Sequence, residues 1–324
     1  MLPLDLNANV RRNFVWFLRI LIFLLPLPGL EDPNSEFFKH GRKLFDLSSL
    51  DLIKFLIATG FPEFMKKFHY QINKKESADF FLSTFLQTMD HREKNDIKRN
   101  DFVSMLLGLK EHFTKEELAA EGFLVYSGGF ETSSTLITFT LFELAINPDI
   151  QDQLREEIKS GLEENDGKLT YDLLFGFKYL DMVVNESLRK YPPISSLARK
   201  SVKDYKIAGT DLVIPKGTTI EMPTYSLHHD PEYYPEPSKF DPERFSPENE
   251  KSRVPFTFLP FGDGPRNCIG LRFGIMQSKV AIVKLLQKFK FTPNLKSPIP
   301  MKFEPASPFL APVGGMWLSL QKIE

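Results

Sequence analysis

The spacing of apolar residues predicts a helix over Asp79–Arg92. Its apolar side chains recur three and four positions apart, which places them on one helical face, at Phe81, Leu82, Phe85, Leu86 and Met89. The next stretch, residues 91–101, is dominated by charged side chains and is predicted to be a solvated loop. From residue 31 to about residue 110 the pattern therefore indicates helices joined by mixed loops.

A longer helix follows, and both of its ends carry recognisable signals. Thr114 stands three residues before Glu117, which is the capping-box arrangement at a helix start. Helical character continues to Ile146, where Asn147-Pro148 ends it. That proline fits the first position of a further amphipathic helix over 149–164, with the asparagine as its cap.

The second half of the chain begins with one more predicted helix and a β-rich stretch. The helix is expected from Thr170 to Lys190, shortly before Pro192-Pro193. Residues 202–224 contain turns at Gly209-Thr210 and at Pro215-Lys216-Gly217 between short β-prone runs. This arrangement predicts a small antiparallel sheet.

The C-terminal part mixes irregular chain with one helix. Residues 228–255 are crowded with Pro, Asp and Glu, which favours an irregular meander, and Ile269–Phe289 is predicted to be helical. The last residues indicate a β-hairpin around Gly314-Gly315. The whole pattern predicts a mainly α protein with a small β region.

The first 30 residues stand apart as an atypical apolar segment. Arg11 and Arg12 precede an apolar run over 14–28, which Arg19 interrupts. A membrane-spanning helix needs about 20 apolar residues, so this run is too short for a secure assignment as one. A basic stretch before a short apolar stretch resembles a signal or signal-anchor sequence, and a buried or membrane-surface helix is the alternative.

Composition excludes several classes of protein. The chain has 324 residues, enough for about two domains or one large one, with 42% hydrophobic and 26% charged residues. These values exclude a disordered chain, a collagen and a polytopic membrane protein. A net charge of −1 gives no overall attraction to nucleic acid or to an anionic membrane, although local charged patches are not excluded by it. The single cysteine excludes an intrachain disulfide and zinc sites built on paired cysteines. The 31 phenylalanines suit either a Phe-rich core or an apolar cavity.

The strongest chemical signal surrounds that cysteine, Cys268. It lies in the run Phe261-Gly262-Asp263-Gly264-Pro265-Arg266-Asn267-Cys268-Ile269-Gly270, immediately before a predicted helix. A helix N-terminus stabilises a thiolate through its free N–H groups, and Gly264 and Gly270 let the backbone approach a flat, bulky group. Arg266 is placed to pair with an anion. A lone cysteine is more often an inert core residue, but this combination is what a haem with propionates requires.

A second signal lies inside the long predicted helix. Gly128 and Gly129 are adjacent there, and each costs about 1 kcal/mol relative to alanine in a helix interior. That cost needs a reason, which is either a close packing contact with another helix or room for a ligand. Glu131 and Thr132 follow directly.

The motif F-x-x-G-x-R-x-C-x-G resembles the haem-binding signature of the cytochrome P-450 family, the haem-thiolate monooxygenases. The resemblance implies that Cys268 is the iron ligand and that Gly128 and Gly129 leave room over the haem. It also implies that Glu131 and Thr132 form an acid–alcohol pair that relays protons. The residues implied to bind haem are Cys268, Arg266, Phe261, Gly264, Gly270, Arg199, Gly128 and Gly129.

Three further residues resemble a structural network of that family. Glu186 and Arg189 are three positions apart and share a helix face, and Arg244 lies in Pro242-Glu243-Arg244-Phe245. By resemblance they form a Glu–Arg–Arg network that supports the haem site. Taken alone, the pair also fits an ordinary surface ion pair. Arg199 is implied to hold a second haem propionate, with an exposed arginine as the alternative.

The resemblance covers about residues 31–324 and is closest to insect microsomal members, a group linked to oxidation of xenobiotics and plant toxins. It implies a partial catalytic domain with the cytochrome P-450 fold, lacking roughly the first third of a full member. The implied cofactor is haem b, with electrons from NADPH through a flavoprotein reductase and with cytochrome b5 as a second partner. The implied substrate is a lipophilic xenobiotic, plant toxin or endogenous lipid or hormone. The implied location is the cytosolic face of the endoplasmic reticulum membrane, in contact with the membrane surface.

The missing third leaves alternatives open. Residues 1–30 fit a transplanted anchor, a shortened transcript or a mistaken gene model. This chain, made alone, is expected to bind haem poorly and to expose apolar surface. The competing functions are a non-catalytic truncated fragment and a haem-binding or ligand-binding protein without turnover.

Overall fold

The computed structural model describes residues 3–5, 36–45, 49–60, 67, 74–297, 299–305 and 307–323. The apolar run at 14–28 lies outside these residues. The described helices are α2 (Glu36–Phe45), α3 (Ser49–Gly60), α5 (Lys75–Lys94), α6 (Phe102–Leu107), α7 (Lys115–Ile146), α8 (Pro148–Glu164), α9 (Tyr171–Gly176), α10 (Lys178–Lys190), α11 (Thr224–His228), α12 (Pro247–Glu250) and α13 (Leu271–Leu286), with 3-10 turns η1 (Pro242–Phe245) and η2 (Gly264–Arg266). The strands are β1 (Pro3–Asp5), β2 (Leu197–Lys200), β3 (Tyr205–Lys206), β4 (Val213–Ile214), β5 (Thr219–Met222), β6 (Phe289–Pro293) and β7 (Trp317–Lys322).

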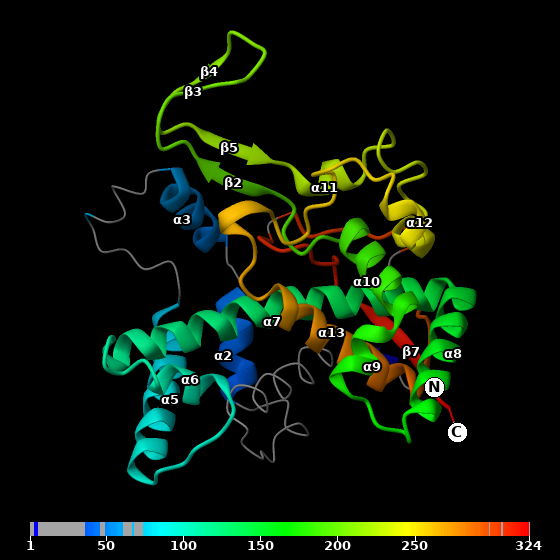
Figure 1. The fold of residues 1–324 in the computed structure, drawn as a ribbon, viewed down its shortest axis with the longest axis horizontal. Helices are drawn as coiled ribbons and strands as arrows, with labels where there is room; N and C mark the ends of the chain where they lie inside the picture. Colours follow the sequence, from blue (N-terminus) through cyan, green and yellow to red (C-terminus); the bar gives the residue numbers. More distant parts are fainter. Residues whose placement is uncertain are drawn as a thin grey trace.

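The long helix α7 forms the centre of the molecule, and the other elements pack around it (Figure 1). Its predicted capping box is confirmed, because the Thr114 hydroxyl accepts from the Glu117 amide at 3.2 Å while the Glu117 carboxylate accepts from the Thr114 amide at 2.8 Å. Every residue from 133 to 145 is buried. A helix that is buried all round needs neighbours on every side.

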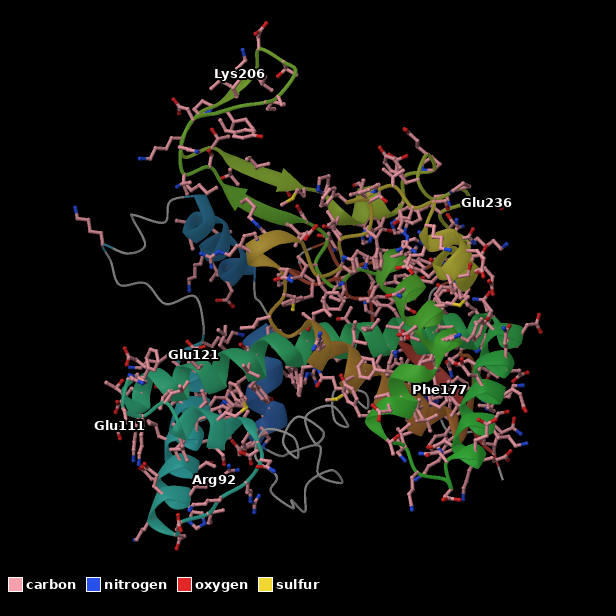
Figure 2. All side chains as sticks on the ribbon, in the orientation of Figure 1. Arg92, Glu111, Glu121, Phe177, Lys206 and Glu236 are labelled. Atoms are coloured by element: carbon pink, nitrogen blue, oxygen red, sulfur yellow. The ribbon has the colours of Figure 1, made fainter. Side chains whose placement is uncertain are left out.

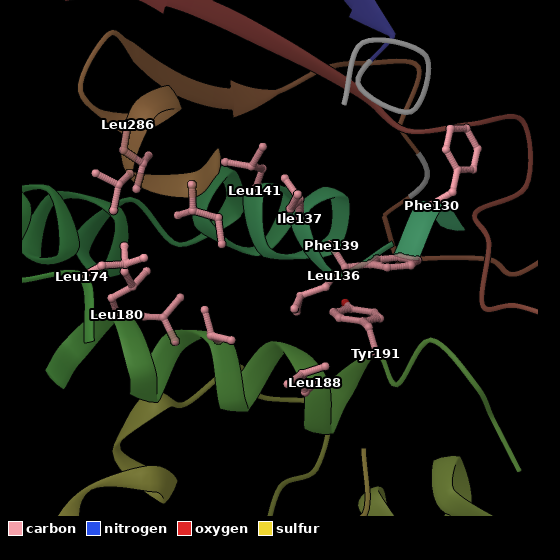
Figure 3. Close-up of a cluster of buried hydrophobic side chains, with 14 of the residues drawn as sticks. Phe130, Leu136, Ile137, Phe139, Leu141, Leu174, Leu180, Leu188, Tyr191 and Leu286 are labelled. Carbon is pink, nitrogen blue, oxygen red and sulfur yellow. The ribbon is translucent and has the colours of Figure 1, made fainter. Parts of the chain in front are cut away.

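Those neighbours are α10, α13 and β6. Figure 3 shows the α7 side chains between Leu286 of α13 on one side and Leu180 and Leu188 of α10 on the other. All three leucines are essentially inaccessible to solvent, at 0%, 0% and 1%. Burial of this kind contributes about 1.5–3 kcal/mol for each large apolar side chain. The C-terminal half of α7 is therefore the core of the structure.

The prediction of one continuous helix from Thr170 to Lys190 is wrong. The chain breaks between α9 and α10 at Phe177, which is extended with φ −70° and ψ 99°. Its ring is buried against α8, where a Cβ on Gly161 would come within 2.5 Å of it (Figure 2). The Glu157 carboxylate of α8 also accepts from the first amides of α10, at 2.8 Å and 2.9 Å. Contacts with a different helix therefore cause the break.

The prediction of a solvated loop over 91–101 is also wrong in part. Residues up to Lys94 belong to α5, and Arg92 and Asp101 are buried together, with Nη1 of Arg92 2.5 Å from Oδ1 of Asp101. Burial acts to raise the pKa of Asp101, but bonds from Arg92 and from the Ser104 amide outweigh it and hold that pKa below its usual value. The charges in this segment thus join α5 to the start of α6.

At the start of α8, Pro148 occupies the first position as predicted. Asn147 stands at the cap position, but its side chain does not cap α8. Its amide nitrogen instead donates back to Glu143, to the backbone carbonyl at 2.8 Å and to the carboxylate at 3.1 Å. The predicted cap position of Asn147 is therefore confirmed, but the residue makes no side-chain capping bond to α8.

The strands form three small antiparallel sheets, ordered β1-β7-β6, β2-β5 and β3-β4. The single sheet expected within 202–224 is confirmed only in part: β3 pairs with β4 there, whereas β5 pairs with β2, outside that stretch, in a separate sheet. The hairpin expected around Gly314-Gly315 is not formed there. Strand β7 pairs with β6 and β1 instead, from Phe289↔Lys322 to Pro293↔Leu318 on its β6 side. The segment 228–255 contains only short helical turns, as predicted, and no helix among the described residues is long and apolar enough to cross a membrane.

Candidate functional site

The loop that carries Cys268 is held in shape by its own backbone. The Cys268 amide donates to the Phe261 carbonyl at 2.8 Å, and the Gly262 amide donates to the Leu259 carbonyl at 3.2 Å. Gly270 then occupies the cap position of α13. Cys268 therefore stands three residues before the first residue of α13, close to a helix start where unpaired N–H groups favour negative charge.

Glycines are required where this loop turns. Gly262 and Gly264 have φ values of +71° and +75°, a backbone region that favours glycine. A Cβ on Gly264 would point into space, with no described heavy atom within 4 Å. Residues 263–269 are all exposed, including the Cys268 side chain. The loop thus presents a thiol on an open face, with its backbone accessible.

The predicted second propionate arginine lies beside this loop. Arg199 belongs to β2, and its Nη2 donates to the Arg266 carbonyl at 3.3 Å. A Cβ built on Gly262 would be 3.6 Å from the same guanidinium. The structure therefore brings Arg199 to the cysteine loop, although the two are 67 residues apart in sequence. Arg266 is exposed and Arg199 is half-buried, and both stand at the rim of the open face, where a guanidinium can meet an anion.

On α7, the predicted glycines and the threonine face outward together. Gly128 and Thr132 are one turn apart, and the Thr132 hydroxyl donates to the Gly128 carbonyl at 2.7 Å. A Cβ on Gly128 would meet no described heavy atom within 4 Å, so no packing contact within the described structure explains this glycine. Gly129 beside it is half-buried.

The two members of the predicted acid–alcohol pair lie in different surroundings. Thr132 is half-buried on the outward line of α7, whereas Glu131 is only 4% exposed. Adjacent residues on a helix point about 100° apart, which accounts for the difference. In this arrangement Thr132, rather than Glu131, borders the open side of α7.

The helix that follows the cysteine loop is fixed to α7 close to these residues. Gln277 of α13 donates to the Ser133 hydroxyl at 2.6 Å, and a Cβ on Gly274 would lie 3.8 Å from the same hydroxyl. Figure 1 shows the segment before α13 crossing over the middle of α7. The cysteine loop and the Gly128–Thr132 turn therefore belong to one region of the molecule.

The predicted Glu–Arg pair is completely buried. Arg189 holds both Glu186 carboxylate oxygens, through Nε at 2.7 Å and Nη2 at 2.8 Å, and both residues are 0% exposed. The guanidinium also donates to the carbonyls of His228 and Pro237, both at 2.9 Å. The alternative of a solvated surface pair is therefore wrong for these residues. Fully paired burial of this kind fixes geometry more than it adds stability.

Arg244 completes the arrangement from the meander. Its Nε lies 3.6 Å from Glu186 Oε1, and its Nη2 donates to the Pro235 carbonyl at 2.6 Å. The backbone amide of Asp241 adds a further bond to Glu186 at 2.9 Å. The structure thus brings together all three residues of the predicted network and ties α10 to the meander.

The sequence patterns missed two contributors. His228 accepts a hydrogen bond from the Leu259 amide at 2.9 Å, and Asp241 supplies its backbone to Glu186. Neither stands in a local motif with its partner, since 31 and 55 positions separate the pairs. Only the fold places them together.

These residues fit a haem held through Cys268. Because Gly264 and Gly128 carry no Cβ, the space beside the cysteine loop and beside α7 stays open. The thiol lies on the exposed face, and arginines stand beside it. A soft thiolate ligand with nearby cations for carboxylates is the donor set of a haem-thiolate site. The class of protein that this fold and site define is a haem-thiolate protein.

Comparison with known proteins gives the family. The family model described as Cytochrome P450 matches residues 4–318, so this chain belongs to the cytochrome P450 family. The predicted mainly α fold of that family is confirmed. Haem b bound through a cysteine thiolate is the cofactor of the family, with electrons supplied from NADPH by a reductase.

Individual relatives are insect proteins, as the resemblance implied. "Probable cytochrome P450 6a13" of Drosophila melanogaster is 43% identical over 309 residues, which cover 93% of this chain and 62% of that protein. "Cytochrome P450 6k1" of Blattella germanica is 39% identical over 91% of this chain and 61% of its own length. "Cytochrome P450 6A1" of Musca domestica is 40% identical over 99% of this chain and 65% of its own length. The chain thus spans about three fifths of the length of these relatives.

Proposed function

We propose that this chain acts in the haem-dependent monooxygenation of a lipophilic small molecule, a xenobiotic, plant toxin or endogenous lipid or hormone. The observation that carries the proposal is the exposed Cys268 thiol in a loop tied to the Phe261 carbonyl. Family membership supports the reaction type. When bound, the haem supplies dioxygen activation, which electron donation from the thiolate favours.

The chain's own residues are proposed to hold the haem and manage protons. Cys268 would hold the iron, and Arg199 and Arg266 would hold the propionates. Gly264 and Gly270 would let the haem plane lie close to the backbone. Thr132 would hold a proton at Oγ1, and its bond to the Gly128 carbonyl fixes the orientation of that hydroxyl. Glu131, which is buried beside Thr132 on α7, would supply the protons that Thr132 passes on.

Partners follow from the same proposal. Electrons would come from an NADPH-dependent flavoprotein reductase, with cytochrome b5 as a second donor. No nucleic acid is expected as a partner, given the net charge of −1.

Contact with the endoplasmic reticulum membrane at its cytosolic face is proposed on the basis of α3. Leu50, Ile53 and Ile57 follow one face of this helix and are 67%, 53% and 39% exposed, with Lys54 exposed beside them. An apolar stripe with an adjacent cation suits a membrane surface. Co-sedimentation with anionic phospholipid vesicles tests this, and replacing the three residues by serine should abolish it.

The activity is tested with purified protein and a reductase. The chain is incubated with haem, and then bound haem, NADPH consumption and product from a panel of lipophilic substrates are measured. Haem binding with substrate-dependent NADPH consumption and an oxygenated product supports the proposal. Haem binding without any turnover supports a binding protein, and failure to bind haem supports a non-catalytic fragment.

A further inference from the structure

His228 lies at the junction between the buried network and the cysteine loop. It ends α11, its side chain is 0% exposed, and both ring nitrogens lie within hydrogen-bond distance of backbone groups. The Leu259 amide donates to Nε2 at 2.9 Å, and Nδ1 lies 3.2 Å from the Arg189 carbonyl. A ring nitrogen that accepts a hydrogen bond carries no proton, so Nδ1 holds the proton and donates it to Arg189.

The imidazole stays neutral in this position. Burial is the main cause that lowers its pKa, to about 3, and the charges of Arg189 and His229 lower it further, against the opposing effect of the backbone bond to Arg189. One acceptor and one donor nitrogen are therefore fixed at neutral pH. Protonation of Nε2 would cost the bond to Leu259.

The same ring packs on the neighbouring residue of the loop. Phe258 stacks on His228 with ring centroids 5.3 Å apart, and it also contacts Phe245 at 4.7 Å. Two consecutive loop residues, 258 and 259, are thus held by one imidazole. On its other side, the His228 carbonyl accepts from Arg189, so these two residues are bonded in both directions.

Backbone hydrogen bonds continue from Leu259 to the amide of Cys268. The Leu259 carbonyl accepts from the Gly262 amide at 3.2 Å, which closes the turn that contains Phe261. The Phe261 carbonyl then accepts from the Cys268 amide at 2.8 Å. A displacement of Leu259 is therefore passed to the backbone of Cys268.

We propose that His228 is a positioning residue for the thiol ligand, which it fixes by accepting the Leu259 amide while it donates to α10. It touches neither the cofactor nor the reacting atoms. The consequence for haem rests on the proposed function, but the effect on the loop does not. A histidine that only fills space would need its ring and not its acceptor nitrogen.

Three substitutions separate these roles. His228→Gln keeps an acceptor oxygen at the position of Nε2, because the glutamine amide reaches as far as that nitrogen. His228→Asn keeps a donor at the position of Nδ1 and loses the acceptor. His228→Phe keeps the ring and loses both. His229→Phe is the matched control, since His229 bonds the Tyr225 carbonyl and stacks on Tyr225 at 4.1 Å, away from the loop.

The readout uses the only cysteine of the chain. A nitroxide label on the exposed Cys268 reports loop mobility by electron paramagnetic resonance without any haem, and hydrogen exchange is measured at the Leu259 amide. Loss of one hydrogen bond should speed that exchange about tenfold. We expect faster exchange and a more mobile label in His228→Asn and His228→Phe, and near wild-type values in His228→Gln and His229→Phe.

Equal behaviour of His228→Gln and His228→Asn would overturn the proposal, because it would show that the acceptor is irrelevant. Circular dichroism and thermal unfolding of each variant establish that it is folded, and the Gln–Asn pair decides the question even if His228→Phe unfolds. In haem-loaded protein, the Asn variant should also lose a larger share of the thiolate-type spectrum than the Gln variant. If the wild-type chain takes up no haem, the proposed function fails while the label experiment still tests His228.

Discussion

The two sides of the cysteine loop differ in how their polar groups are satisfied. On one side, Arg189 and Glu186 are completely buried, and the Arg189 guanidinium donates to the Glu186 carboxylate and to backbone carbonyls. On the other side, Cys268 and Arg266 are exposed on an open face. The buried side consists of groups that need one another, because an unpaired buried charge is costly. The open side consists of groups that the proposed function assigns to a cofactor.

This difference predicts unequal costs for removing an arginine. Arg189→Ala leaves the Glu186 carboxylate buried beside only one remaining guanidinium, so we expect a loss of about 3–5 kcal/mol in the free energy of unfolding. Arg266→Ala, on the open face, should change it by no more than about 0.5 kcal/mol in the absence of haem. Urea unfolding followed by circular dichroism measures both. Similar losses in the two variants would erase the distinction between the two sides.

The proposed proton transfer on the open face is tested by the variant Thr132→Ala. In haem-loaded protein with a reductase, Thr132→Ala should leave haem binding and the thiolate spectrum unchanged, because the residue belongs to α7 and not to the cysteine loop. Positioned proton transfer typically contributes about 10²–10⁴-fold, so product formed per NADPH should fall and peroxide release should rise. Product and peroxide are measured against NADPH consumed. Altered thermal stability with unaltered coupling would show that Thr132 only packs the helix.

The second buried ion pair, Arg92 with Asp101, lies away from the candidate site and tests the same comparison. The pKa of Asp101 lies below its usual value in the folded chain, so its ionised form stabilises the fold at neutral pH and that contribution is lost as the pH falls below about 4. The difference in unfolding free energy between wild type and Asp101→Asn should therefore be largest near pH 7 and shrink between pH 4 and pH 2. Unfolding measured across this range checks the sign. A difference that grows towards acid pH would contradict it.

A modest effect, confined to stability, is expected at the exposed end of α7. Thr114→Ala removes the side-chain bond to the Glu117 amide and should cost about 1 kcal/mol, as helix caps usually do. It should not change label mobility at Cys268, since the capping box lies far along the helix from the loop. Thermal unfolding measures the loss of stability, and spin-label spectra measure the mobility of the label at Cys268. A more mobile label would mean that the helix end and the loop are coupled.

Local signals explain why part of the fold could be predicted. The bounds of α7 follow from Thr114 with Glu117 at one end and Asn147-Pro148 at the other, all within a few residues. The break at Phe177 could not be found in this way, because it depends on Gly161 and Glu157 of another helix. The prediction of a C-terminal hairpin was wrong for the same reason, since β7 pairs with a strand more than twenty residues away.

The residues of the candidate site also fall into two groups, those found from local motifs and those that only the fold brings together. The cysteine loop and the Glu186–Arg189 pair are local motifs, so the sequence was sufficient to find them. The contact of Arg199 with the loop and the bond from Leu259 to His228 join residues 67 and 31 positions apart. Arg199 was identified only through family resemblance, and His228 required the fold.

The central claim is that Cys268 provides a thiolate to haem iron. It is tested most directly by the absorption spectrum of the reduced carbon-monoxide complex of the haem-incubated 324-residue chain, compared with Cys268→Ser. We predict the strongly red-shifted Soret band of thiolate ligation in the wild type and its complete loss in the variant. The same red-shifted band in Cys268→Ser would contradict the assignment.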